Sequence, residues 1–341
     1  AEKGHRLQGK IVNVLVMGAG AVGSVAGGLL SGAGHRVHLV GRDPHMGAIR
    51  LRPLAIGGIW GEHRARDLEV HTEASQVPRK PFDLVLITTK TYDTGTATDE
   101  VLPLVGDDTL VASLQNGVGN VESIADRVGA ERALGARVMF GAEVVEPGRV
   151  EVTVQGGDLM LGSPTGAVPL PRIGELARVF SQAGISAQAT DQITGFLWGK
   201  LLYSCALNAL SALLGVNYGK LQETEATRSI IWDVIVEIFA VAAEHRVELS
   251  WPRPEDFRDL LFGELVPATA AHMASMHADL KAGKRTEILS LNGAIARMGE
   301  EVGVPTPASS LLTRLICARE SLGAREGLRA RDQGSTDHLI E

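Results

Sequence analysis

The segment that decides the fold of the N-terminal half reads IVNVLVMGAGAVG, residues 11–23. Its first seven residues are almost all apolar, which predicts a buried β-strand over residues 11–17. A glycine-rich turn follows at once, and small and apolar residues then continue with helical character over residues 21–33. A strand, a glycine-rich turn and a helix in direct succession indicate the first unit of a layered α/β fold.

The three glycines of this turn, Gly18, Gly20 and Gly23, have different tasks. The first permits the tight turn, the second lets the backbone approach a pyrophosphate, and the third lets the helix pack closely on the strand. The N-terminus of the helix also offers unpaired N–H groups to an anion. We therefore predict a dinucleotide site, with close helix packing without a ligand as the alternative. The expected contacts are Gly18, Ala19, Gly20, Ala21, Val22 and Gly23.

The residues after the second predicted strand, 36–40, indicate which dinucleotide binds. An NAD site has an acidic residue there for the ribose 2′-hydroxyl, whereas an arginine can hold the 2′-phosphate of NADP. The chain reads Gly41-Arg42-Asp43, so the arginine comes first. This order favours NADP(H) with Arg42 on the 2′-phosphate, and Asp43 keeps NAD(H) as the minor alternative.

Alternating strand and helix patterns continue to about residue 190, and long helical patterns then extend to about residue 325. Apolar strands separated by helices indicate a mostly parallel sheet covered on both faces. We predict an α/β protein with a Rossmann-type, doubly wound, mostly parallel sheet and an all-α C-terminal domain. The predicted divisions are a sheet domain 1–190 with residues 1–10 flexible, a helical domain 191–325 and a tail 326–341. Further strands are expected at 83–88, 110–114 and 185–189, with a hairpin in 140–161 and a helix at 171–183.

Composition excludes several classes of protein. Of the 341 residues 45% are hydrophobic and 21% charged, which is close to the globular average, and the 40 glycines have no collagen period. The net charge of −7 gives no reason to bind a polyanion, so we expect no nucleic-acid partner. The N-terminal residues carry no export pattern, and Cys205 and Cys317 fit no metal or disulfide spacing, which favours the cytoplasm.

A line of polar residues runs along an otherwise apolar helix predicted at 197–214. Lys200, Ser204 and Asn208 recur at every fourth position and Ser211 follows, so they share one face over about 12 Å. Burying unpaired polar groups is costly, which favours a polar ligand beside this face over a lysine that merely reaches water. Residues 196–216 are long enough to cross a bilayer, but the same polar groups would need partners there, so we expect no membrane.

At this point the chain resembles the ketopantoate reductase family (2-dehydropantoate 2-reductase), over about residues 11–318. The resemblance rests on five motifs in order. They are the glycine-rich turn, Thr89-Lys90, Gln115-Asn116-Gly117-Val118-Gly119, Trp198-Gly199-Lys200-Leu201 with Asn208, and Lys284-Arg285-Thr286-Glu287-Ile288 with Asn292-Gly293.

The resemblance implies NADPH-dependent reduction of 2-dehydropantoate to (R)-pantoate, a precursor step of pantothenate and coenzyme A. Lys200 would be the general acid that protonates the substrate carbonyl oxygen, and Glu287 would hydrogen-bond the substrate. Arg42, Lys90 and Asn116 would bind the cofactor. The substrate-binding positions would be Lys200, Ser204, Asn208, His272, Ser275 and Glu287. Asn116 in an Asn-Gly turn and Glu287 at a helix start also have purely structural explanations.

Three positions depart from the family pattern. Ser204 and His272 replace asparagines, and Leu289 replaces an aspartate. The first two change which hydrogen bonds the substrate site can make, and such sites are sensitive to single lost donors. Reduction of another 2-oxo acid or ketone therefore stays an alternative, with a non-catalytic NADPH sensor as a third. The family includes monomers and dimers, so a homodimer stays open.

Overall fold

The N-terminal strand–turn–helix prediction is confirmed. In the computed structural model, β1 (Asn13–Met17) leads through the glycine turn into α1 (Ala21–Gly32), and β2 (Arg36–Val40) pairs with β1 in parallel. The structure describes residues 9–336, with side chains to residue 323. Of the N-terminal segment predicted to be flexible, 1–10, residues 1–8 lie outside the described residues.

The first unit is built on an eight-stranded sheet with the order β12-β11-β8-β7-β6-β1-β2-β5. All its pairs are parallel except β11 with β8, as the apolar strand pattern predicts. The chain leaves β1 towards β2 on one side and later occupies β6 and β7 on the other, which creates a switch point at β1 and β6. The other strands are β5 (Leu68–His71), β6 (Leu84–Ile87), β7 (Leu110–Ser113), β8 (Ala133–Arg137), β11 (Leu159–Gly162) and β12 (Ala187–Ala189).

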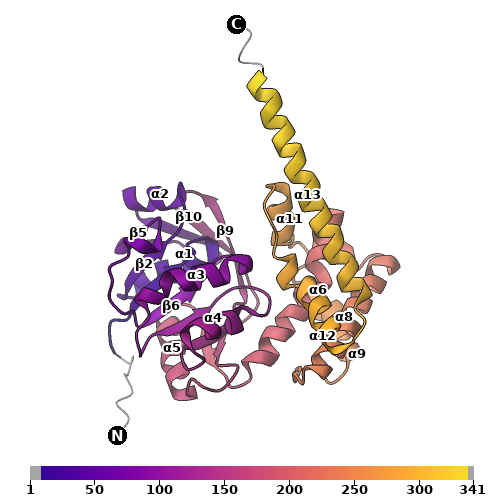
Figure 1. The fold of residues 1–341 in the computed structure, drawn as a ribbon, viewed down its shortest axis with the longest axis horizontal. Coiled ribbons are helices and arrows are strands. Elements are labelled where there is room, and N and C mark those ends of the chain that lie inside the picture. The colour runs from indigo at the N-terminus through magenta and orange to yellow at the C-terminus, as the bar shows by residue number, and fades with distance from the viewer. Residues whose placement is uncertain (1–8, 337–341) are drawn as a thin grey trace. The chain divides into compact units, whose positions relative to one another are not determined.

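A second sheet of four strands, β4-β3-β10-β9, covers the far side of α1. The expected hairpin forms between β9 (Phe140–Glu146) and β10 (Arg149–Gln155), and β10 also pairs with β3 (Leu54–Gly58). We did not predict β3, β4 (His63–Ala65) or β5, because their strands are short and their segment has weak strand periodicity. The ribbon in Figure 1 shows α1 among the strands of this unit.

Two adjacent glycines let α1 fit between the sheets. A Cβ at Gly27 would lie 2.5 Å from Leu39 Cδ2 of the large sheet. A Cβ at Gly28 would lie 2.6 Å from Ile56 Cδ1 of the small sheet. Helix α1 is therefore closely packed on both sides. The opposite face of the large sheet packs on α3 (Thr94–Val101) and α4 (Asn120–Val128), while α5 (Leu170–Gln182) lies against β11 and β12.

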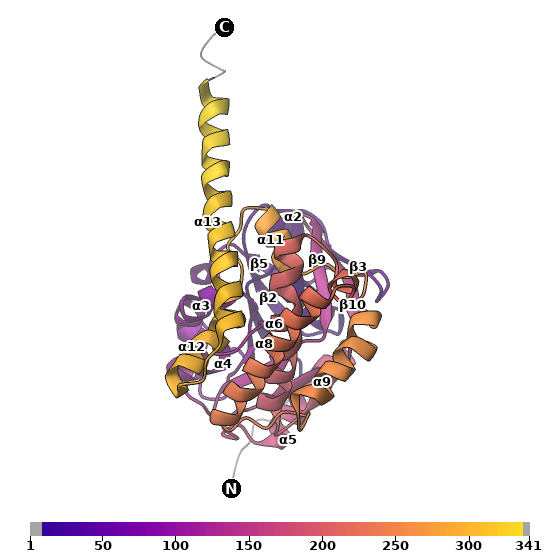
Figure 2. The same cartoon turned by 90° about the vertical axis from the view of Figure 1, so that its right-hand side faces the viewer.

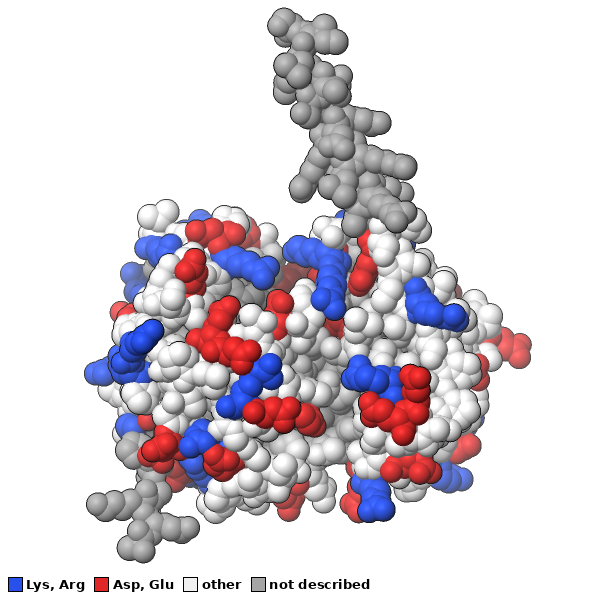
Figure 3. Space-filling view, in the orientation of Figure 1, with Lys and Arg blue, Asp and Glu red and all other residues white. Residues whose placement is uncertain are grey.

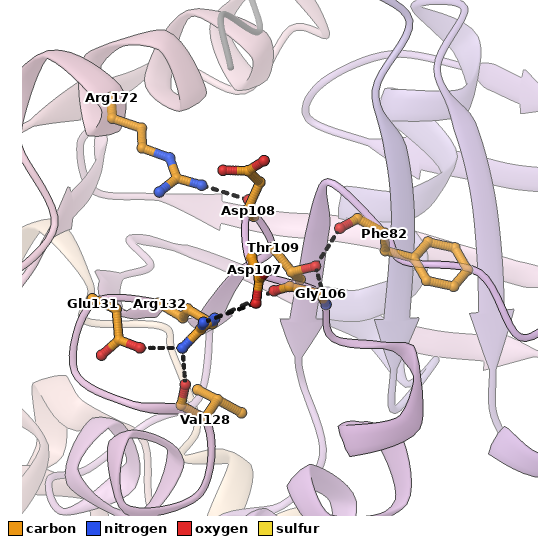
Figure 4. A network of polar contacts seen from close by, with 9 residues as sticks. All are labelled: Phe82, Gly106, Asp107, Asp108, Thr109, Val128, Glu131, Arg132 and Arg172. Carbon is orange, nitrogen blue, oxygen red and sulfur yellow. Dashed lines mark hydrogen bonds and ion pairs between the residues drawn. The ribbon is translucent and has the colours of Figure 1, made fainter. Parts of the chain in front are cut away.

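The N-terminal ends of β6, β7 and β8 are held by a polar network (Figure 4). Thr109 Oγ1 donates to the carbonyl of Phe82 at 2.6 Å and accepts from Gly106 N at 2.8 Å. Arg132 donates to the carbonyl of Val128 at 2.8 Å and pairs with Glu131, and Arg172 donates to the Asp108 carbonyl. These bonds lie at the N-terminal ends of the strands, whereas the glycine turn lies at the C-terminal ends. We therefore infer that they stabilise the fold.

The second unit is helical (Figure 2), and its core is formed by the long helices α6, α8, α12 and α13. Glu237 of α8 is 7% exposed, and its two carboxylate oxygens accept from Ala308 N at 2.6 Å and Ser309 N at 2.9 Å. This carboxylate caps the N-terminus of α13. The helices are α6 (Ile193–Leu214), α7 (Tyr218–Leu221), α8 (Glu225–Glu244), α9 (Pro254–Leu260), η4 (Leu261–Leu265), α10 (Val266–Ala268), α11 (Ser275–Lys281), η5 (Ile288–Ser290), α12 (Asn292–Val302) and α13 (Pro307–Thr336).

The two units divide between Leu197 and Trp198, further along the chain than the predicted division at 190/191. The reason is that the first turn of α6 packs on the sheet: a Cβ at Gly162 would lie 2.5 Å from Ile193. The tail predicted from residue 326 needs a correction. Helix α13 continues to Thr336, because alanine, arginine and leucine sustain a helix there, and residues 337–341 lie outside the described residues.

Helix α6 is, among the described residues, the one helix long and apolar enough to cross a membrane by length and composition. Within the structure 61% of its apolar window is buried, which is typical of a core helix in a folded domain. On the face drawn in Figure 3 the acidic and basic side chains are interspersed. Exposed ion pairs such as Arg127 with Asp99 contribute little stability each.

Candidate functional site

The glycine turn adopts a geometry that other residues could not take at two of its positions. Gly18 has φ +108°, and a Cβ there would lie 2.5 Å from Thr89 N. A Cβ at Gly23 would lie 2.6 Å from both the Gly18 carbonyl oxygen and Thr88 Oγ1. Thr88 Oγ1 donates to that carbonyl at 2.8 Å, which joins the ends of β1 and β6. The turn is therefore fixed by its neighbours before any ligand arrives.

Gly20 differs from the other two glycines because the space beside it is open. A Cβ at Gly20 would meet only the Gly18 carbonyl oxygen, at 3.9 Å. Gly20 is exposed, and Ala21 and Val22 of the first helical turn are half-buried. First-turn N–H groups have no acceptor within their own helix and suit a phosphate. This cradle fits the pyrophosphate of a dinucleotide, and Ala19, 5% exposed, supports it from beneath.

Arg42 and Asp43 after β2 have different surroundings. The Arg42 side chain is 92% exposed and makes a loose ion pair of 3.9 Å with Asp93. Asp43 Oδ1 accepts from Gly47 N at 2.7 Å, in the first turn of α2 (His45–Leu51). The carboxylate oxygen is thus already used in the fold, whereas the guanidinium can turn to a phosphate.

The ends of β6 and β7 carry Lys90 and Asn116, both half-buried. A chain of hydrogen bonds fixes the Asn116 backbone: Gln115 Nε2 donates to Thr94 Oγ1 at 2.8 Å, Thr94 Oγ1 to Asn120 Oδ1 at 2.9 Å, and Asn120 Nδ2 to the Asn116 carbonyl at 2.8 Å. Gly117 and Gly119 have positive φ, as a tight loop requires. Strands β7, β6, β1 and β2 are neighbours and parallel, so their C-terminal ends lie at the same end of the sheet. The residues that follow these ends are Asn116, Lys90, the glycine turn and Arg42, respectively.

In the helical unit the predicted polar face of α6 is present. The helix is continuous over Lys200, Ser204, Asn208 and Ser211, so these residues share one face. Lys200 and Asn208 are half-buried, Ser204 is 8% exposed and Ser211 is fully buried. Ser211 has a structural task, because Ser211 Oγ donates to the Val216 carbonyl at 2.7 Å and accepts from Ala274 N at 3.4 Å.

Asn208 is held by a tyrosine that the sequence analysis missed. Tyr218, 2% exposed, donates through its hydroxyl to Asn208 Oδ1 at 2.6 Å. Its ring meets the rings of Tyr203, at 5.8 Å, and His272, at 5.1 Å, edge to face. Burial raises the pKa of the Tyr218 hydroxyl far above its usual value, so it stays a donor. Two of the three tyrosines in the chain, Tyr203 and Tyr218, lie in this cluster. Their scarcity is the one feature of the sequence that could have indicated it.

His272 and Asn208 contact the same residue, Tyr218. The His272 carbonyl accepts from Tyr218 N at 3.0 Å, and burial lowers the pKa of the His272 imidazole, which favours the neutral form. Ser275 is exposed at the first residue of α11, directly after the Ala274 amide that Ser211 holds. The residue before Ser275 is thus joined to α6 through Ser211.

Glu287 is half-buried and lies directly before η5. Its segment is fixed on both sides. Thr286 N donates to Glu320 Oε1 at 2.8 Å, and Asn292 Nδ2 donates to the Cys205 carbonyl of α6 at 3.1 Å. Asn292 is fully buried and ties the Glu287 segment to the middle of α6. Leu289 is 45% exposed, so the residue that replaces the family aspartate takes no part in the core.

The comparisons with known proteins agree with this arrangement. The family model described as ketopantoate reductase PanE/ApbA matches residues 14–166, and the model of its C-terminal part matches residues 192–320. The 2-dehydropantoate 2-reductase of Aquifex aeolicus is 35% identical over 93% of this chain and 99% of its own length.

Solved structures give the same result. A ketopantoate reductase of the PanE/ApbA family from Ralstonia eutropha JMP134 has a TM-score of 0.82 at 33% identity, covering 91% of this chain and 99% of its own. A D-mandelate dehydrogenase with NADH and anilino(oxo)acetate has a TM-score of 0.81 at 28% identity, with 91% and 99% covered.

A nucleotide-cradling sheet unit and a helical unit with a lysine-bearing polar face define a pyridine-nucleotide-dependent reductase. The chain belongs to the ketopantoate reductase family.

Proposed function

We propose that this chain reduces 2-dehydropantoate to (R)-pantoate with NADPH, a step of pantothenate biosynthesis. The observation that carries the proposal is the polar face of α6, where Lys200, Ser204 and Asn208 lie together on a helix that is otherwise buried. The relatives named 2-dehydropantoate 2-reductase, at 35% and 34% identity, support the same substrate.

Lys200 acts as the general acid. Bound NADPH would be the hydride donor to the substrate carbonyl carbon, so negative charge would develop on the carbonyl oxygen. The Lys200 ammonium donates a proton to that oxygen and stabilises the developing charge. Its half-buried position removes part of the competing water, which strengthens this interaction.

Asn208 and Glu287 orient the substrate. The Tyr218 hydroxyl donates to Asn208 Oδ1 and fixes the orientation of the amide group. Asn208 Nδ2 can then donate to a carboxylate or hydroxyl of the substrate. Glu287 accepts from the substrate hydroxyl, on a segment that Thr286 and Asn292 hold rigidly. Ser204, His272 and Ser275 complete the polar lining.

The cofactor preference follows from the loop after β2. Arg42 is exposed and available for the 2′-phosphate, whereas the Asp43 carboxylate already accepts from Gly47 N in the first turn of α2. Gly18, Gly20 and Gly23 shape the pyrophosphate turn, and Lys90 and Asn116 face the nicotinamide half. NADPH is therefore the preferred reductant, used in the cytoplasm by a monomer or a homodimer.

A second candidate substrate is an aromatic 2-oxo acid. It is favoured by the rings of Tyr218, Tyr203 and His272 that gather beside Asn208, and by the likeness to a D-mandelate dehydrogenase bound to anilino(oxo)acetate. Aromatic side chains in edge-to-face contact suit a flat ring.

Initial rates of NADPH oxidation with 2-dehydropantoate and with 2-oxo-2-phenylacetate test the proposal. We expect kcat/KM to be higher for 2-dehydropantoate by at least about tenfold. A higher value for the aromatic acid would transfer the assignment to the second candidate. Binding of NADPH without turnover of either acid would contradict both.

A further inference from the structure

We infer that this chain has a binding site for a divalent transition metal ion such as Zn²⁺, formed by His38, Glu69 and His71. Among the described residues these three form the one group of histidine, cysteine and acidic side chains close enough to share an ion. One nitrogen of each imidazole and one carboxylate oxygen all lie within 4.8 Å of one another. Nothing in the proposed reduction uses them.

The sheet register brings the three side chains together. His38 lies on β2 and is the register partner of Glu69 on the edge strand β5, and His71 follows two residues later. Residues two apart on a strand point to the same face, so Glu69 and His71 both join His38. The backbone is thus fixed by strand pairing before any metal binds.

The distances are close to those that a metal ion needs. His38 Nδ1 lies 3.1 Å from His71 Nε2, and His38 Nε2 lies 3.3 Å from Glu69 Oε1. Two ligands with bonds of about 2.0–2.1 Å around a tetrahedral Zn²⁺ are roughly 3.3 Å apart. These distances involve different nitrogens of the His38 ring, and one ion can bind only one of them. With Nε2 as the ligand, Glu69 is already close, and the His71 side chain has to rotate from its contact with Nδ1 towards the ion.

His38 provides the second, independent observation. Its side chain is 1% exposed, and its Nε2 makes no hydrogen bond within the described part of the chain, although Glu69 is near. A buried ring nitrogen that makes no hydrogen bond is costly, and a metal ion bound to it would offset this cost. Phe82 packs edge to face on the same ring at 5.1 Å and fixes its orientation.

The charges around the site set the expected strength of binding. Lys80 and Arg50 lie near enough to oppose a cation, against the single carboxylate of Glu69. Glu69 is 60% exposed, so water can fill the fourth position. We expect 1:1 binding in the micromolar range rather than the tighter binding of a closed structural site.

The ion would connect two strands beneath the Arg42 turn. Gly41 N donates to the His71 carbonyl at 3.1 Å, so the end of β5 already supports the chain directly before Arg42. A metal held by β2 and β5 would fasten this edge of the sheet.

Calorimetry with Zn²⁺ and visible spectroscopy with Co²⁺ test the site on the untagged full-length chain after chelator treatment. We expect one saturable site, with the visible absorption of tetrahedral Co²⁺. Glu69→Gln and His71→Gln, which alter the two less buried ligands, should each weaken binding by about tenfold or more.

The matched controls are Glu100→Gln and His63→Gln, which change an exposed acid and an exposed histidine outside the cluster. They should leave the Kd unchanged. No saturable binding up to about 1 mM Zn²⁺, or the same Kd in all four variants and the parent, would overturn the inference.

Discussion

The Tyr218 hydroxyl donates a 2.6 Å hydrogen bond to Asn208 Oδ1, which leaves the Asn208 amide nitrogen as the group that can meet a ligand. Tyr218→Phe removes this bond and lets the amide rotate. A lost hydrogen bond of this kind costs about 0.5–1.5 kcal/mol, so we expect KM for the 2-oxo acid to rise roughly 2–10-fold. The measurement is steady-state kinetics at saturating NADPH. Tyr203→Phe, whose hydroxyl pairs with Thr269 at 2.8 Å, is the matched control and should change KM less.

Lys200→Ala removes the proposed general acid. Because such a group contributes about 10²–10⁴-fold to a rate, we expect kcat to fall by at least a hundredfold while NADPH still binds. Fluorescence titration of NADPH checks that the nucleotide site is intact. Lys220→Ala, at an exposed lysine paired with Glu223, should keep full activity. Full turnover by Lys200→Ala would exclude the proposed mechanism.

Arg42→Ala tests the choice of cofactor. A charge-assisted contact with a phosphate is worth about 1.5–3 kcal/mol, so KM for NADPH should rise roughly 10–150-fold, with little change for NADH. The ratio of kcat/KM for the two cofactors measures this directly. Arg64→Ala, at an exposed arginine of β4, should leave the ratio unchanged. An equal loss for both cofactors would argue against 2′-phosphate recognition by Arg42.

Gly20→Ala and Gly18→Ala separate ligand binding from folding. A methyl group at Gly20 has open space, so we expect a nearly unchanged Tm and NADPH binding weakened roughly tenfold or more. At Gly18 the φ of +108° and the contact with Thr89 N should lower the free energy of unfolding by more than about 2 kcal/mol. Thermal denaturation and NADPH titration of both variants give the result. Unweakened binding by Gly20→Ala would mean that the pyrophosphate lies elsewhere.

His45 links stability to pH. Its Nδ1 accepts from Gly148 N at 3.1 Å, and a protonated nitrogen cannot accept. Burial lowers the pKa of His45 below its unfolded value, so the stability that depends on the neutral ring is present above about pH 6.5 and is lost as pH falls. We expect Tm to decrease from about pH 7.5 to 5.5, and to decrease less in His45→Gln. His63→Gln, at an exposed ring, should show the parental slope, and equal slopes in all three proteins would contradict the prediction.

The parts of the fold that follow from neighbouring residues could be predicted from the sequence. The turn depends on the backbone freedom of Gly18 and on the small size of Gly23, both of which the local motif records, and the polar face with Lys200 and Asn208 depends only on helical period. Both are confirmed as structure, while the roles of these residues stay predictions.

Contacts between distant segments could not be predicted in this way. Tyr218 reaches Asn208 across a loop, Asn292 reaches the Cys205 carbonyl from 87 residues away, and His38 meets His71 only through strand pairing. Each depends on how elements pack, and no periodic pattern records it.

The glycines at positions 27 and 28 have a thermodynamic consequence for the nucleotide turn. Helix α1 is in contact with a sheet on each side, so it cannot roll or shift along its axis without opening one of them. The N–H groups at its start, which we propose bind the pyrophosphate, are consequently ordered when the chain folds. Their conformational entropy is lost at folding and not at each encounter with a nucleotide, which leaves more of the contact energy to appear as affinity.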